Sequence, residues 1–85
     1  MKTFEYIIKD ELGIHARPAG MLVKKAQSLD SSVTVEVNGK TADATKVFAV
    51  MGLGAKQNDA LKITVDGGDE DASVRELTEF FTANL

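Results

Sequence analysis

The sequence predicts an α+β fold in which a four-stranded antiparallel sheet carries three helices on one face, in the order βαββαβα. Three observations lead to this class. Apolar and polar residues alternate in short runs, as in strands with one buried face. Longer segments repeat their apolar residues at helical spacing. Finally, Asn38-Gly39 joins two alternating runs and predicts a hairpin, which favours antiparallel pairing.

The first half of the chain predicts a strand, a helix and a second strand. Residues 2–9 alternate and predict the first strand. The next apolar residues recur at helical spacing and predict a helix over residues 16–28. They are Ala19, Leu22, Val23, Ala26 and Leu29. Pro18 fits the first turn of this helix, where its missing N–H costs little. The next strand leads into the hairpin through Val33, Val35 and Val37.

The second half adds two strands and two helices. The hairpin continues into Lys40-Thr41-Ala42, and residues 46–53 predict a short helix with Thr45 as a possible cap. The last strand alternates through Leu61, Ile63 and Val65 before Gly67-Gly68. From Asp69 onward, acidic residues suit the start of a final helix. Its expected apolar face consists of Val74, Leu77, Phe81 and Leu85.

Size and composition narrow the functional classes. We expect one domain over residues 1–85, too small for a separate catalytic module. The absence of cysteine excludes a disulfide, a thiolate metal site and a cysteine nucleophile. Charges are interspersed in the first residues, Met1-Lys2-Thr3-Phe4-Glu5-Tyr6, and no run of 18 apolar residues occurs, so we expect neither a signal peptide nor a membrane span. The net charge of −3 argues against nucleic acid as a partner.

Positive charge is concentrated in the middle of the chain, while the last quarter is acidic. The basic residues are Arg17, Lys24, Lys25, Lys40, Lys46 and Lys56, and the late acids are Asp69, Glu70, Asp71, Glu76 and Glu79. This distribution predicts a local basic patch suited to an acidic protein surface.

The only histidine, His15, lies where the chain enters its first predicted helix. An imidazole is in good part unprotonated near neutral pH, so its free nitrogen can attack phosphorus. A phosphoryl group there would meet free backbone N–H groups and the positive end of the helix dipole, and Arg17 could add a charge-assisted contact. His15 is therefore a candidate phosphoryl acceptor.

The segment Gly13-Ile14-His15-Ala16-Arg17-Pro18-Ala19 resembles the active-site signature of the histidine phosphocarrier family. The resemblance extends over nearly the whole chain, through Val23-Lys24, Asn38-Gly39-Lys40-Thr41, Val50-Met51-Gly52-Leu53-Gly54 and the acidic last helix. It implies an open-faced β-sandwich of the bacterial sugar phosphotransferase system.

By this resemblance, His15 would accept a phosphoryl group on Nδ1 from phosphorylated enzyme I and deliver it to enzyme IIA domains, without contacting sugar. Ala16, Arg17 and Pro18 would form the phosphoryl cradle, with Arg17 stabilising the group. The expected partner surface consists of Gly20, Lys24, Val47, Phe48 and Met51. We expect a cytoplasmic monomer without cofactor or metal, with regulatory proteins as possible further partners.

One departure from the family pattern concerns regulation. Many Gram-positive members carry a kinase-regulated serine at the position of Lys46, and lysine cannot take that phosphate. The neighbouring Thr45 has a hydroxyl, but as an expected helix cap it would serve the backbone instead.

The sequence leaves several alternatives open. Val47, Phe48 and Met51 could equally be core residues. The chain could also be a regulatory binding module that uses the phosphate only as a signal, or a small acid-base enzyme. Gly52-Leu53-Gly54 lacks the context of a dinucleotide site, and Asp69-Glu70-Asp71 suits a helix start better than a cation.

Overall fold

The computed structural model describes residues 1–85 and contains the seven expected elements in the expected order. The strands are β1 (Lys2–Ile7), β2 (Ser32–Val37), β3 (Lys40–Asp43) and β4 (Ala60–Asp66), and the helices are α1 (Ala16–Ser28), α2 (Val47–Gly52) and α3 (Glu70–Asn84). The strands form one antiparallel sheet in the order β1-β4-β2-β3. This confirms the predicted α+β fold.

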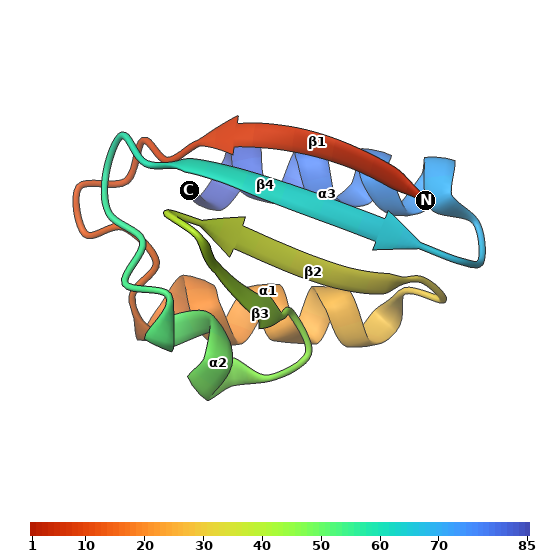
Figure 1. The fold of residues 1–85 in the computed structure, drawn as a ribbon, viewed down its shortest axis with the longest axis horizontal. Helices are drawn as coiled ribbons and strands as arrows, with labels where there is room; N and C mark the ends of the chain where they lie inside the picture. Colours follow the sequence, from red (N-terminus) through yellow and green to blue (C-terminus); the bar gives the residue numbers. More distant parts are fainter.

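The sheet and the helices form two layers, with α3 behind β1 and β4 and α1 behind β2, while α2 lies beside β3 (Figure 1). Alternation along β2 explains why the helices cover only one face of the sheet. Val33, Val35 and Val37 are buried, whereas Ser32 and Thr34 on the other face are exposed. The sheet therefore packs on the helices through one face only.

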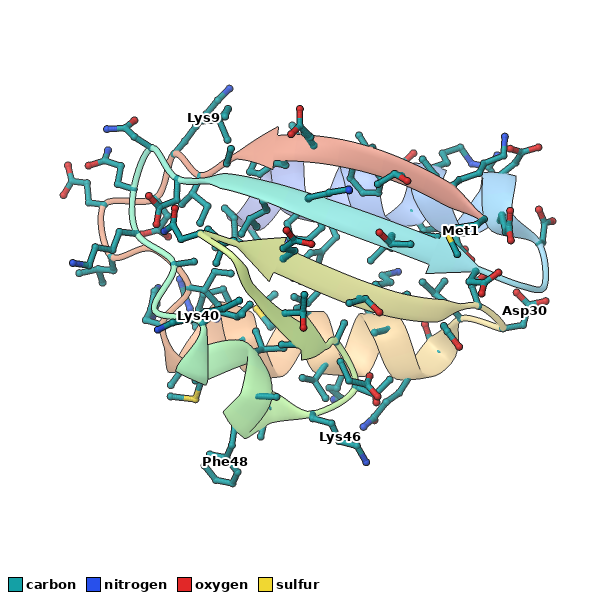
Figure 2. The ribbon with its side chains drawn as sticks, viewed as in Figure 1. Met1, Lys9, Asp30, Lys40, Lys46 and Phe48 are labelled. Carbon is teal, nitrogen blue, oxygen red and sulfur yellow. The ribbon has the colours of Figure 1, made fainter.

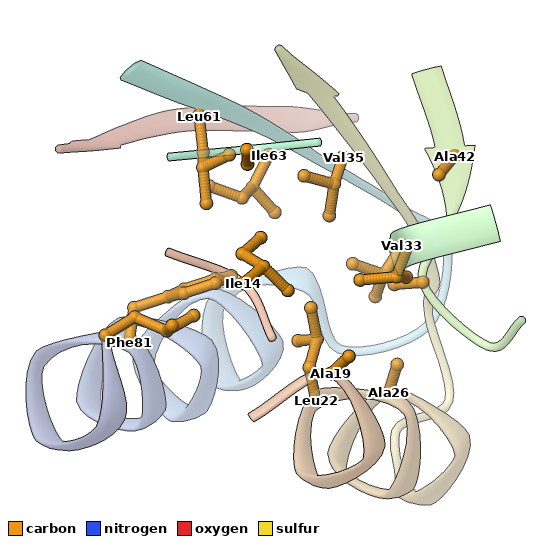
Figure 3. Close-up of a cluster of buried hydrophobic side chains, with 14 of the residues drawn as sticks. Ile14, Ala19, Leu22, Ala26, Val33, Val35, Ala42, Leu61, Ile63 and Phe81 are labelled. Carbon is orange, nitrogen blue, oxygen red and sulfur yellow. The ribbon is translucent and has the colours of Figure 1, made fainter. Parts of the chain in front are cut away.

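A single cluster of buried side chains fills the space between the layers. Figure 3 shows Leu61, Ile63 and Val35 of the sheet facing Leu22 of α1 and Phe81 of α3. Phe81 also packs against the rings of Phe4, Tyr6 and Phe80. This core fixes α1 and α3 against the sheet, and hence the position at which α1 begins.

The hairpin between β2 and β3 has the backbone that the sequence requires. Asn38 and Gly39 adopt φ values of 50° and 80°, in the left-handed region that asparagine and glycine tolerate best. The turn sets the register, in which Val37 pairs with Lys40 and Val35 with Ala42.

The end of the first strand and the buried face of the last helix differ from the sequence-based expectation. The first strand ends at Ile7 rather than at residue 9, because the amides of Lys9 and Asp10 leave the ladder and donate to the carbonyl of Leu85. The buried face of α3 includes Ser73 and Phe80, which the helical pattern missed, while Val74 is only half-buried. Ser73 is accommodated there by a hydrogen bond of 2.8 Å with the hydroxyl of Ser31.

Thr45 is not the cap of α2. Its hydroxyl and its amide both donate to Oδ1 of Asp43, at 2.7 and 2.9 Å, and Lys46 occupies the cap position without a side-chain hydrogen bond. An aspartate two residues earlier competes successfully for the groups of Thr45, as in an Asx turn. The backbone N–H of Thr45, followed by its hydroxyl, lowers the pKa of Asp43.

Candidate functional site

The loop that leads to His15 is held by close backbone packing. Gly13 has a φ of 65°, and a Cβ atom there would lie 2.2 Å from the carbonyl oxygen of Ala55. The amide of Ile14 donates to that same oxygen at 3.1 Å. Any other residue at position 13 would have to push the two segments apart, so glycine is required for this approach.

Ile14 anchors the residue immediately before His15. Its side chain is buried and points into the space between α1 and α3, near Ala19 and Phe81 (Figure 3). The backbone of His15 is thus fixed on one side by a core residue and on the other by the first turn of α1.

His15 occupies the N-cap position of α1, with φ −93° and ψ −178°. Its carbonyl accepts the hydrogen bond from Ala19 at 3.0 Å, but its side chain makes no capping bond. The imidazole is therefore not committed to the helix, and its side chain is 30% exposed. Nε2 faces Oδ2 of Asp10 at 3.8 Å, longer than a direct hydrogen bond.

The first turn of α1 offers groups that suit an anion. Its backbone N–H groups have no intrahelical acceptors, and the turn contains no acidic residue. Ala16 and Arg17 are exposed, and Arg17 takes part in none of the ion pairs of the chain. Pro18 is buried and lies in the first turn, where no N–H donor is needed. The positive end of the helix dipole is left open beside His15.

Helix α2 resolves one of the open questions of the sequence. The ring of Phe48 is 85% exposed and points away from the body of the molecule (Figure 2). Met51 is 39% exposed, whereas Val47 is half-buried against the core. Only Val50 of this helix is buried. Phe48 is thus a surface residue, as a docking role requires, although Val47 is partly a packing residue.

The basic side chains are not all equally available. Arg17, Lys24, Lys40, Lys46 and Lys56 are exposed. Lys25 is half-buried and lies 3.4 Å from Glu76 of α3, which compensates its charge. Lys25 is therefore less available to a partner than the sequence suggests.

Sequence reasoning missed three residues around this end of the molecule. Asp10 faces His15, and only the fold of the intervening loop brings the two together. Leu12 and Met21 are large apolar side chains with exposed fractions of 73% and 41%. Met21 follows Arg17 by four residues on α1, so helical spacing puts it on the same side as Arg17.

No three His, Asp or Glu side chains lie close enough together to hold a metal ion. The surface cavity of about 490 Å³ lies away from His15 and is lined by polar residues of the last turn of α1, β2 and β3, such as Gln27, Thr34 and Thr41. None of the helices is long and apolar enough to cross a membrane.

The chain matches a family of known proteins and is similar to individual members of it. Residues 2–83 match the family model described as PTS HPr component phosphorylation site. The phosphocarrier protein HPr of Lysinibacillus sphaericus is 40% identical over 82 residues, which cover 96% of this chain and 93% of that protein.

Two solved structures have the same fold. The histidine-containing phosphocarrier protein of Mycoplasma superposes with a TM-score of 0.92 at 30% identity, covering 96% of this chain and 93% of that one. HPr from Thermoanaerobacter tengcongensis superposes with a TM-score of 0.91 at 31% identity, covering 98% and 93% of the two chains.

Proposed function

Because the chain belongs to the HPr family of phosphocarrier proteins of the phosphotransferase system, we propose that it carries a phosphoryl group on His15. The group is received from phosphorylated enzyme I and passed to enzyme IIA domains. The observation that carries this proposal is the start of α1, where a partly exposed imidazole stands at the cap position without capping the helix.

The chemistry needs little beyond positioning and charge stabilisation. A lone pair of the His15 ring forms a bond to phosphorus while the N–P bond of the donor phosphohistidine breaks and its electron pair returns to the donor ring. Negative charge on the phosphoryl oxygens meets the free N–H groups of the first turn of α1 and the guanidinium of Arg17. The same contacts hold the group until an acceptor histidine takes it.

Docking is proposed to use the apolar surface of α2 together with exposed cations. Phe48 and Met51 supply apolar contact, and Lys24 and Lys46 supply positive charge for acidic partners. Such a patch suits brief encounters, since rim charges mainly accelerate association. Gly20, half-buried on α1, adds no side chain that would hinder a close approach.

We also propose that this chain escapes the serine kinase of the family. Lys46 offers no hydroxyl, and the hydroxyl of Thr45 already donates to Asp43 at 2.7 Å. The carboxylate of Asp43 also lies where an incoming phosphate would be repelled.

Labelling with enzyme I and phosphoenolpyruvate tests the carrier function directly. The wild-type chain should acquire one acid-labile phosphoryl group, and His15→Ala should acquire none. The labelled chain should then lose its phosphate to an enzyme IIA domain, which separates a carrier from a module that uses phosphate only as a signal. Equal labelling of both chains would contradict the role of His15.

The docking surface is tested by Phe48→Ala. Because the ring is 85% exposed, the variant should keep its unfolding free energy within about 0.5 kcal/mol. Its affinity for enzyme I should fall by about tenfold or more if the ring is a binding anchor. Phe48→Tyr, which keeps the ring, should bind normally. Lower stability with unchanged affinity would make Phe48 a structural residue.

A further inference from the structure

Asp10 is held in place by three hydrogen bonds in the loop before His15. Its amide donates to the carbonyl of Leu85 at 2.9 Å, and its carbonyl accepts from the amide of Gly13 at 3.0 Å. One carboxylate oxygen, Oδ1, accepts from the amide of Leu12 at 2.8 Å. These bonds fix both the backbone and the side chain of Asp10.

The second carboxylate oxygen is directed at His15. Oδ2 lies 3.8 Å from Nε2 of the imidazole, and the two side chains are 28% and 30% exposed. This separation is longer than a hydrogen bond, and hydrogen bonds at reacting groups are often long in the free protein and tighten only when the partner is bound. Nδ1 has no protein acceptor or donor.

We propose that Asp10 is a positioning residue for phosphoryl transfer, selecting Nδ1 of His15 as the reacting atom by holding the ring proton on Nε2. The inference rests on the proposed carrier function. A carboxylate accepts hydrogen bonds only, so the ring form with its proton on Nε2 is favoured. That form leaves the lone pair of Nδ1 free to attack.

The same contact serves the phosphorylated state. When Nδ1 bonds to phosphorus, the proton stays on Nε2 and the ring carries a positive charge, which the carboxylate of Asp10 offsets. When the phosphoryl group moves on, the N–P bond breaks and the ring departs as neutral imidazole. Without the Nε2 proton it would have to depart as an imidazolate anion, a far poorer leaving group.

Other charged groups do not provide this contact. Arg17 lies on the first turn of α1, and Lys56 lies in the segment packed against Gly13, but neither forms an ion pair with His15 or Asp10. Glu11 follows Asp10 directly, is exposed and makes no hydrogen bond through its side chain. Glu11→Gln is therefore a matched control, because it removes the same charge from the neighbouring position.

Asp10→Asn tests the proposal with little disturbance of the loop. The amide oxygen can still accept from Leu12, which turns the NH2 group toward Nε2 and makes Nε2 an acceptor. The ring proton should then move to Nδ1. Ring ¹⁵N resonances, recorded at a pH where His15 is neutral, should show the proton on Nε2 in the wild type and in Glu11→Gln, and substantially on Nδ1 in Asp10→Asn.

Transfer kinetics supply the second measurement. Acceptance of phosphate from enzyme I should be about tenfold slower in Asp10→Asn, the low end for a hydrogen bond to a charged group, and unchanged in Glu11→Gln. In Asp10→Ser the serine hydroxyl can also accept from the amide of Leu12, but the carboxylate is gone. This variant replaces Asp10→Asn if Asp10→Asn does not fold.

The results separate the two proposals. An unchanged ring tautomer in Asp10→Asn or Asp10→Ser, with normal transfer, would overturn the role of Asp10 while leaving the carrier function intact. A wild-type chain that enzyme I cannot label would overturn the carrier function, and the ring resonances would still decide whether Asp10 sets the tautomer.

Discussion

Helices α1 and α3 begin in opposite ways. Helix α3 starts at Asp69, whose Oδ1 accepts from the amide of Ala72 at 3.1 Å, and its first turn contains Glu70 and Asp71. Helix α1 starts at His15, which makes no side-chain capping bond, and its first turn contains Arg17 and no acid. One start is closed by the protein's own carboxylates and the other is left open.

The difference shows what an open helix start costs and what it provides. A capping side chain typically contributes about 0.5–2 kcal/mol, and acidic residues in the first turn add to this through the dipole. Helix α1 lacks both contributions. Its unpaired N–H groups and positive dipole instead remain available to an external anion.

The largest expected effect comes from giving α1 a cap. Asparagine at position 15 is a favoured cap residue and cannot carry the phosphoryl group of a histidine. His15→Asn should therefore abolish labelling by enzyme I, yet be about 1 kcal/mol more stable to urea than His15→Ala.

Two results would contradict this interpretation. Equal stability of the two His15 variants would mean that the start of α1 does not need a cap. Labelling of His15→Asn would place the acceptor elsewhere.

The cation in the first turn of α1 is the next difference to test. Arg17→Lys keeps the charge but replaces a planar fork of donors by a single ammonium group. Because Arg17 is exposed and unpaired, stability should change by less than about 0.5 kcal/mol. Transfer from enzyme I, followed by rapid quench, should slow by about tenfold. Unchanged kinetics would show that charge alone suffices at this position.

The contrast between the two starts was partly visible in the sequence. Asp69-Glu70-Asp71 and the lone Arg17 are local signals, and so is the Asn38-Gly39 turn, because backbone preference acts over a few residues. The sequence did not show that the side chain of His15 leaves the start of α1 uncapped. The loop that leads to His15 packs through Gly13 against Ala55, and this contact joins distant parts of the chain.

Other features needed tertiary information for the same reason. Helix α2 has six residues, too few for its apolar pattern to tell that Val50 is buried and Phe48 is exposed. Thr45 is the exception, because Asp43, which accepts its hydroxyl, lies only two residues earlier and is a local signal for an Asx turn. The approach of Asp10 to His15 depends on the path of a loop, which no periodicity describes.

Removing the cap of α3 should have a smaller effect, confined to stability. Asp69→Ala deletes the acceptor of the Ala72 amide and should lower the unfolding free energy by about 1 kcal/mol. Phosphoryl transfer should be unaffected, since α3 and α1 begin at opposite ends of the sheet (Figure 1). Asp69→Asn keeps the cap and should restore most of the loss. Slower transfer in a folded Asp69→Ala chain would mean that the two helix starts are coupled.

The smallest expected effect is a pH dependence at the closed start of α3. The amide of Gly67 donates to Glu70 at 2.6 Å and lowers the pKa of this carboxyl from its usual value of 4.5. A lowered pKa in the folded state means that the charged form stabilises the fold above the usual value, and that this contribution is lost as pH falls through the folded-state pKa. The difference in unfolding free energy between the wild type and Glu70→Gln should therefore be present at neutral pH and vanish in acid. A wild-type-to-Glu70→Gln difference that persists unchanged into acid would mean that the charge of Glu70 contributes nothing.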